Sequence, residues 1–180
     1  MKIAVIGRGN VGGGLADKWE RAGHTVTRIG REGGDVSDAD AVLIAVPGGA
    51  IEEALDKVQG LEGKTAIDAT NLFGADRPSG FDSNAEFVKS RTNGPTAKSF
   101  NANYAALYDQ VEGSRAGNLW SGDEEARGVV EQLIADAGYE PIHAGGLENA
   151  RMQEDFLPLM GAIQQSVGRF FYRMAPPGSF

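Results

Sequence analysis

The chain opens with the run Lys2-Ile3-Ala4-Val5-Ile6-Gly7-Arg8-Gly9-Asn10-Val11-Gly12, which carries its strongest structural signal. An apolar strand pattern is followed by glycines spaced as GxGxxG and then by a helical pattern from Leu15 to Arg21. In this order the first glycine permits a tight turn, the second lets the backbone approach a pyrophosphate, and the third allows close packing of helix and strand. The start of the helix offers free N–H groups and a partial positive charge to phosphates. We therefore predict that the segment from Gly7 to Gly12, with Arg8, Gly9, Asn10 and Val11, binds a dinucleotide; a glycine-rich loop in an unrelated α/β domain is the alternative.

Composition limits the classes of protein to which the chain can belong. Its 180 residues suffice for one domain with a hydrophobic core. A net charge of −8 argues against a nucleic-acid partner, which would require a basic patch. Because the chain contains no cysteine, it offers no disulfide, no thiolate nucleophile and no cysteine-ligated metal. The N-terminus lacks a signal-peptide pattern and no apolar run reaches the roughly 20 residues of a membrane span, so we expect a cytoplasmic enzyme without a membrane partner.

Strand and helix patterns alternate along the chain, which is typical of a mainly parallel sheet covered on both faces. Further strands are predicted at residues 24–29, 40–46, 64–68, 97–100, 118–121 and 140–143, and helices at 51–58, 84–90 and 123–137. Only a few residues separate the second strand from the third, so the usual helix and third strand of the first mononucleotide half are missing. The predicted fold is a Rossmann doubly wound α/β sheet, shortened after the second strand.

Apolar residues recur at helical spacing from Asn149 to Met174, interrupted by Pro158. They predict one long helix that is kinked or started at the proline and is followed by a tail to Phe180. The apolar stripe packs either on the rest of the chain or on a second copy. We therefore assign residues 1–146 to a nucleotide-binding domain, and residues 147–180 to a helix and tail that cover an acceptor site or form a contact in a homodimer.

The residues that follow the second strand bear on the choice of nucleotide. An acidic residue at this point usually binds the ribose 2′-OH of NAD, whereas cations bind the 2′-phosphate of NADP. The chain has Gly30-Arg31-Glu32 here, with Arg28 in the strand and Arg8 in the glycine turn, so up to three guanidinium groups could reach the adenosine end. Because a guanidinium can bond two phosphate oxygens at once, we predict NADP. In the alternative, Arg28 and Arg31 are solvated surface residues and Glu32 binds the ribose.

Two later segments resemble a known family. Lys98-Ser99-Phe100-Asn101 is similar to the Lys-Ala-Phe-Asn of the NADP oxidoreductases that depend on coenzyme F420, whose fold the reductase domain of the STEAP metalloreductases shares. The run from His143 to Arg151 is similar to that family's Asp-Ala-Gly-Pro-Leu, polar pair and arginine. In Gly30-Arg31 a glycine replaces the family's serine, so only the arginine carries over.

The resemblance implies a site and a reaction. Val46 and Pro47 would pass beside the nicotinamide ribose, and Asn71 and Asn101 would face the nicotinamide and the acceptor; the alternative for Asn71 is that it simply ends a strand. The implied reaction is hydride transfer between NADP(H) and a small-molecule acceptor, either the deazaflavin F420 or a flavin-like ring held against the nicotinamide. Such a transfer requires geometry more than acid or base groups, so we assign no catalytic residue and no metal.

Two residues and two other functions stay open at this point. His143 is expected to be an ordinary strand-end residue, and Arg151 either contacts an anionic group of the acceptor or pairs with Glu148 or Glu154. One alternative function is an imine or keto-acid reductase of the 6-phosphogluconate-like type, although such enzymes usually have a larger C-terminal helical domain. Another is a non-catalytic protein that senses NADP(H).

Overall fold

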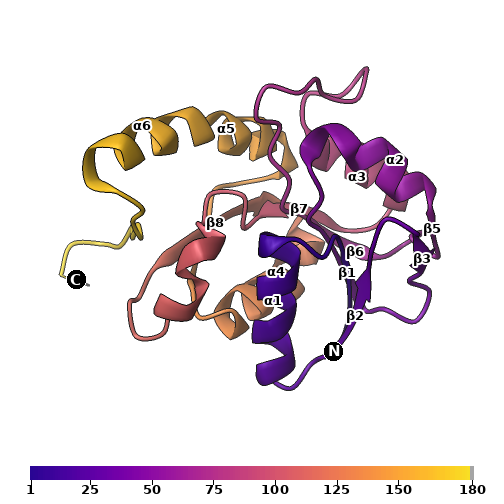
Figure 1. The fold of residues 1–180 in the computed structure, drawn as a ribbon, viewed down its shortest axis with the longest axis horizontal. Coiled ribbons are helices and arrows are strands. Elements are labelled where there is room, and N and C mark those ends of the chain that lie inside the picture. The colour runs from indigo at the N-terminus through magenta and orange to yellow at the C-terminus, as the bar shows by residue number, and fades with distance from the viewer. Residues whose placement is uncertain (179–180) are drawn as a thin grey trace.

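A seven-stranded sheet forms the centre of the computed structural model, which describes residues 1–178 (Figure 1). The order of the strands is β2-β1-β4-β6-β7-β8-β9, and all neighbours are parallel except β7 and β8. The bounds are β1 Lys2–Ile6, β2 Thr25–Ile29, β4 Ala41–Ile44, β6 Thr65–Asp68, β7 Thr96–Ser99, β8 Gly117–Gly122 and β9 Glu140–His143. All seven predicted strands are present, and the predicted Rossmann-type α/β fold is confirmed.

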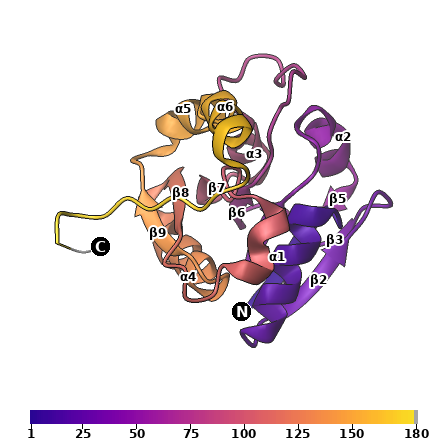
Figure 2. The same ribbon diagram turned by 60° about the vertical axis from the view of Figure 1, so that its left-hand side comes forward.

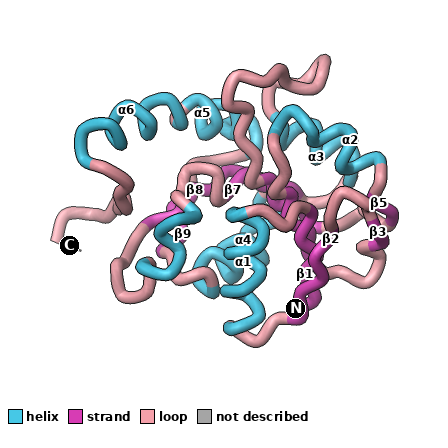
Figure 3. The backbone as a smooth tube through the Cα atoms, viewed as in Figure 1, coloured by secondary structure: helices cyan, strands magenta, loops and turns pink. Residues whose placement is uncertain are grey.

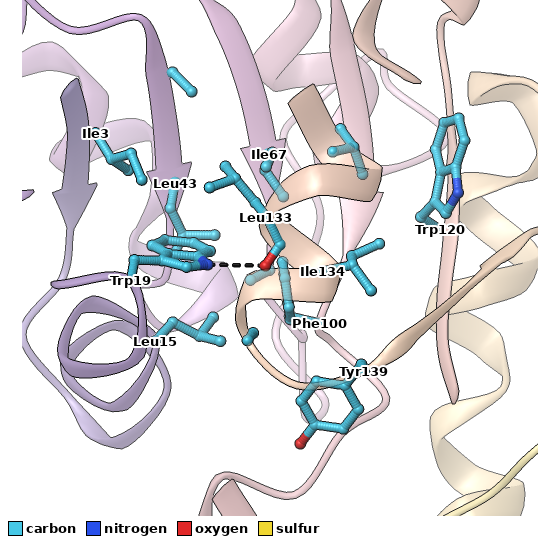
Figure 4. Packing of buried hydrophobic residues seen from close by; sticks show 14 of the residues in the cluster. Ile3, Leu15, Trp19, Leu43, Ile67, Phe100, Trp120, Leu133, Ile134 and Tyr139 are labelled. Carbon is cyan, nitrogen blue, oxygen red and sulfur yellow. Dashed lines mark hydrogen bonds between the residues drawn. The ribbon is translucent and has the colours of Figure 1, made fainter. Parts of the chain in front are cut away.

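Helices cover both faces of the sheet (Figures 1 and 2). Successive side chains of a strand point to opposite faces, and β1 and β4 are apolar at nearly every position, so each face buries its own core. Helices α1 (Asn10–Arg21) and α4 (Arg127–Asp136) pack on one core, where Trp19 Nε1 donates a 2.9 Å hydrogen bond to the carbonyl of Leu133 (Figure 4). Helices α2 (Ile51–Asp56) and α3 (Asn84–Thr92) pack on the other. Short 3₁₀ helices occur at η1 (Gly48–Ala50), η2 (Ala105–Gln110) and η3 (Glu124–Ala126).

The connection between β2 and β4 contains no helix, as predicted. It contains only the two-residue strand β3 (Gly34–Asp35), which pairs with β5 (Val58–Gln59) in a separate small sheet. The helix predicted to reach Val58 therefore ends earlier, at Asp56, because the backbone of Val58 pairs with β3 instead.

The C-terminal region differs from the single helix predicted to Met174. It consists of η4 (Leu147–Asn149), α5 (Ala150–Asp155) and α6 (Leu157–Val167). Figure 3 shows the last two as helices that follow one another along the top of the molecule. Pro158 lies in the first turn of α6, where a missing N–H removes no helical hydrogen bond. Gly168, with φ of +79°, ends the helix, so the prediction of a helix to Met174 is wrong.

The chain after α6 is extended and returns to the sheet. The carbonyl of Tyr172 accepts a 2.7 Å hydrogen bond from the N–H of Gly117 at the start of β8, and Phe171 packs on the core. This part of the apolar stripe thus covers the chain's own body. Residues 179 and 180, the end of the predicted tail, lie outside the described residues. Within residues 1–178, no helix combines the length and the apolar character needed to cross a bilayer.

Candidate nucleotide-binding cleft

A cleft of about 920 Å³ lies at the edge of the sheet where β1, β4, β6 and β7 end. In the strand order, the chain moves from one side of β1 to the other between β2 and β4, which is the topological switch point where open α/β sheets bind ligands. The cleft is lined by Gly9 to Val11, Ala45 to Pro47, Ala69, Asn71 to Ala75, Arg77, Asn101 to Ala106, and parts of α5, α6 and the segment after α6. Its volume is in the range of natural small-molecule sites.

The glycine turn has the geometry that a pyrophosphate requires. Gly7 has φ of +107°, and a Cβ on it would lie 2.3 Å from the carbonyl oxygen of Ala45. A Cβ on Gly12 would lie 2.0 Å from the carbonyl oxygen of Gly7, so helix α1 packs directly on the turn. Gly9 differs from both, because it lines the cleft and a Cβ on it would meet no atom within 4 Å. The free space next to Gly9 is where a ligand can approach the backbone.

The start of α1 is open to an anion. Gly9 is the N-cap residue, no side chain caps the helix, and its first turn contains no acidic residue. The N–H groups of the first turn therefore have no intrahelical acceptor, and the helix dipole adds a partial positive charge at the same place. Asn10 and Val11 line the cleft beside this helix start. The residues present thus fit a nucleotide diphosphate.

Arg8 reaches from the glycine turn to the end of β2. Its guanidinium lies over Gly30, where a Cβ would be only 1.7 Å from Nη2, so glycine is needed at position 30 for this arrangement. The same guanidinium forms an ion pair with Glu32. Hydrogen bonds from backbone N–H groups, and then the charge of Arg8, hold the pKa of Glu32 below its ordinary value. A cation and a carboxylate therefore lie together where the ribose 2′-position is expected.

Arg28 and Arg31 behave differently from each other. Arg28 turns to α1, where its guanidinium bonds Asp17 at 2.5 Å and Glu20 at 2.8 Å, so the expectation that Arg28 reaches the adenosine end is wrong. Those two carboxylates are one helical turn apart on the helix that packs on β2, which explains the direction of the side chain. Arg31 is exposed directly after Gly30. Arg8 and Arg31 are thus the two arginines at this end.

Asn71 and Asn101 meet in the wall of the cleft. Asn71 Nδ2 donates to the backbone oxygen of Asn101 at 2.7 Å, and Asn101 Nδ2 donates to Asn71 Oδ1 at 3.2 Å. Gln153 on α5 completes the group, because its Nε2 donates to Asn101 Oδ1 at 2.7 Å and its backbone oxygen accepts from Asn101 Nδ2. The amide of Asn101 therefore fixes α5 to the end of β7. Val46 and Pro47, predicted beside the nicotinamide ribose, line the same cleft.

A buried ion network adjoins the cleft through Glu154. The Lys98 ammonium is fully buried and donates to Asp68 Oδ2 at 2.7 Å, to the carbonyl of Thr70 at 2.7 Å and to Glu154 Oε1 at 3.0 Å. Glu154 lines the cleft and also receives Arg77 Nε at 3.2 Å on its other oxygen. Since a buried charge is tolerated only with partners, this network fixes α5 and the loop of Arg77 relative to β6 and β7.

Some of these residues were not predicted from the sequence, and others lie outside the cleft. Gln153 and Glu154 were missed as site residues; the available signal was a polar pair inside the apolar stripe. Arg151 bonds Asp155 at 2.6 Å, so the predicted partners Glu148 and Glu154 are wrong. His143 ends β9 and stacks on Trp120 at 4.2 Å, as an ordinary strand-end residue would. Across residues 1–178, no three His, Asp or Glu side chains are grouped closely enough to hold a metal ion.

Comparison with known proteins gives matches among solved structures. No family model and no curated protein matches the chain. A protein described as a proposed F420-dependent NADP reductase from Arthrobacter sp. is similar at a TM-score of 0.79 and 23% identity, over 98% of this chain and 100% of the other. A reductive aminase from Aspergillus terreus, in complex with NADPH and ethyl levulinate, is similar at a TM-score of 0.68 and 18% identity, and this chain spans 63% of its length. A 3-hydroxyisobutyrate dehydrogenase from Mycobacterium tuberculosis is similar at a TM-score of 0.67 and 16% identity, and this chain spans 62% of its length. The resemblance to the F420-dependent reductases is thus confirmed at the level of the fold.

Proposed function

We propose that this protein is an NADPH-binding oxidoreductase that transfers a hydride between NADP(H) and a deazaflavin (F420) or flavin-like acceptor. The observation that carries the proposal is the glycine turn: Gly7 and Gly12 have no room for a side chain, whereas Gly9 faces free space beside an uncapped helix start. Similarity in fold to NADP-linked reductases along the whole chain supports the choice of reaction class.

In this proposal residues 1–146 bind the nucleotide. The N–H groups from Gly9 to Val11 would hold the diphosphate, and Val46 and Pro47 would lie beside the nicotinamide ribose. Arg8 and Arg31 would bind the 2′-phosphate, with Gly30 leaving room for the guanidinium. When bound, NADPH supplies the hydride; the chain orients the two rings and keeps water from the space between them.

Residues from 147 onward complete the acceptor side of the cleft in this proposal. Small or apolar residues, among them Ala69, Ala105, Pro158 and Gly161, line much of the cleft, and they suit the faces of a planar ring. Phe73 lines the same cleft with 83% of its surface exposed and can stack on such a ring. Asn71 would offer hydrogen bonds at the edge of the rings, and solvent provides the proton that completes the reduction.

Imine or keto-acid reduction is a second candidate. The reductive aminase whose fold is similar was solved with NADPH, which favours the same nucleotide and a C=N or C=O acceptor. The chain, however, spans only 63% of that enzyme's length. We therefore place the flavin-like acceptor first.

The test is oxidation of NADPH, followed anaerobically by stopped-flow absorbance, with F420, FMN, FAD, a cyclic imine and a keto acid as separate acceptors. The proposal expects oxidation with a deazaflavin or flavin. Oxidation only with the imine or keto acid would support the second candidate, and binding of NADPH without oxidation by any acceptor would indicate a sensor.

A matched pair of glycine variants controls this test. Gly9→Val adds a side chain in free space at normal φ, so it should leave the unfolding temperature unchanged and abolish oxidation. Gly128→Val, also in free space but in α4, should change neither. Equal activity of both variants would contradict the placement of the diphosphate.

We also propose a homodimer formed through α6. Leu159 and Val167 are 54% and 65% exposed on this helix, whereas the segment after it packs on the chain itself. A helix whose apolar side chains remain partly exposed is a common subunit contact. Sedimentation velocity of the wild-type chain and of Leu159→Lys measures this: the variant should sediment as a monomer, and a monomeric wild type would contradict the proposal.

A further inference from the structure

The segment directly after α6 places one arginine, Arg169, in the wall of the cleft. Most guanidinium groups on this side of the molecule are engaged by carboxylates. Arg77 pairs with Glu154 and Asp155, and Arg151 pairs with Asp155. Arg169 has neither an ion pair nor a hydrogen bond with any residue in the described range 1–178. Arg169 is exposed to solvent and lines the cleft, so its charge is available to a ligand that enters there.

The backbone on both sides of Arg169 is held in place. Gly168 ends α6 and donates its N–H to the carbonyl of Gln164 at 2.9 Å. Phe170 packs edge-on against Tyr104 with ring centroids 5.6 Å apart, and the Tyr104 hydroxyl donates to the carbonyl of Met160 at 3.2 Å. Tyr104 and Arg169 both line the cleft; burial raises the pKa of Tyr104, and the charge of Arg169 opposes that rise. The exposed side chain of Arg169 therefore extends from a fixed point on the α6 side of the cleft.

The two carboxylates that line the cleft, Glu154 and Asp155, are already paired with other cations. Glu154 already receives Lys98 and Arg77, and Asp155 already receives Arg77 and Arg151. The surrounding lining from α6 and from the η2 side, which includes Met160, Gly161 and Ala105, carries no charge. The acceptor side of the cleft thus combines apolar walls with one uncompensated cation at its edge.

We infer that Arg169 binds an anionic substituent of the acceptor, a carboxylate or a phosphate, while the apolar walls hold the acceptor's ring. This inference rests on the proposed function, since it names the class of acceptor for the same cleft. A guanidinium suits either anion because its planar fork can bond two oxygens at once. The diphosphate of the nucleotide is assigned to a different place, the start of α1, so Arg169 is free for the second substrate.

The experiment compares two acceptor probes with the same ring: FMN, which carries a phosphate, and riboflavin, which does not. Binding of each oxidised flavin to the protein loaded with NADP⁺ is measured by fluorescence for the wild type, Arg169→Ala, Arg169→Lys and the control Arg151→Ala. We expect the wild type to bind FMN at least tenfold more tightly than riboflavin. Arg169→Ala should weaken FMN binding about 10- to 100-fold, the range of a charge-assisted hydrogen bond, and leave riboflavin unchanged. Arg169→Lys should recover part of the loss, and Arg151→Ala should resemble the wild type.

The outcomes separate this inference from the proposed function. Three results would overturn the role of Arg169. In Arg169→Ala, these are an equal loss of affinity for FMN and riboflavin, or no loss of affinity for FMN. The third is a wild type that binds NADPH but neither flavin. A fall in NADPH affinity in Arg169→Ala, with flavin binding unchanged, would assign the arginine to the nucleotide instead and also overturn it. Failure of the wild type to bind NADPH at all would overturn the proposed function itself.

Discussion

Lys98→Met removes the cation of the buried network under the cleft. The Lys98 side chain has no exposed surface, and its ammonium contacts two carboxylates, Asp68 at 2.7 Å and Glu154 at 3.0 Å. Methionine is similar in length and volume, so the variant leaves no large cavity. It does leave two buried carboxylates without their shared cation, and breaking a buried ion pair in this way costs about 3–5 kcal/mol. We expect the free energy of unfolding to fall by about that amount, a large part of the roughly 5–15 kcal/mol of a typical domain.

Urea unfolding, followed by the fluorescence of Trp19 and Trp120 and by far-UV circular dichroism, measures this loss. The matched control is Lys64→Met, because Lys64 is only partly buried and donates to the backbone carbonyls of Ser37 and Ala39 rather than to carboxylates. The control should lose only about 1 kcal/mol. A loss below about 1 kcal/mol for Lys98→Met, with an unchanged dependence on urea, would refute the reasoning about the buried charges.

Three further predictions concern the turn, the alkaline stability and the choice of nucleotide. Gly7→Ala should lower the free energy of unfolding by roughly 2–4 kcal/mol in thermal denaturation, because its Cβ would lie 2.3 Å from the Ala45 oxygen at φ of +107°; an unchanged melting temperature would contradict the assigned geometry. Burial raises the pKa of Tyr172 to about 12, above its value in the unfolded chain. The contribution of the neutral side chain to the free energy of unfolding is therefore complete below about pH 10 and is lost between about pH 10 and 12. In Tyr172→Phe that alkaline loss should be smaller by about 1 kcal/mol at about pH 11, and parallel profiles of both proteins would show that Tyr172 does not titrate as described. Glu32→Gln removes the carboxylate that competes for Arg8 and should raise the ratio of NADPH to NADH affinity about 5- to 10-fold. The control Glu20→Gln, whose carboxylate pairs with Arg28, should leave this ratio unchanged. An unchanged ratio in Glu32→Gln as well would show that Glu32 does not contribute to the choice of nucleotide.

The sequence predicts most of the fold because its signals are local. The strands of the sheet are short apolar runs between turn residues, and the glycine turn requires features that only glycine provides. The C-terminal helix is shorter than its apolar spacing predicts. Phe170 and Phe171 continue the helical spacing, but Gly168 ends the helix and the following backbone finds hydrogen-bond partners at β8. Spacing alone does not show this, because the competing partner lies about 50 residues earlier in the chain.

The candidate site was only partly predictable for the same reason. Gly9, Pro47 and Asn101 line one cleft because they follow strands that end at one edge of the sheet, which the order of elements already implies. The direction of long side chains depends on partners from distant segments. Arg28 turns to α1, Arg8 crosses to Glu32, and neither is decided by the residues next to it in sequence.

The central claim is that the start of α1 binds the diphosphate of a pyridine nucleotide. Isothermal titration of the folded protein with NADPH, repeated with Gly9→Val, tests it most directly. We predict one NADPH bound per chain by the wild type, weaker binding of NADH, and no binding of either by a Gly9→Val variant that unfolds at the wild-type temperature. A folded wild-type protein that binds neither nucleotide, or a Gly9→Val variant that binds NADPH as well as the wild type, would contradict the claim.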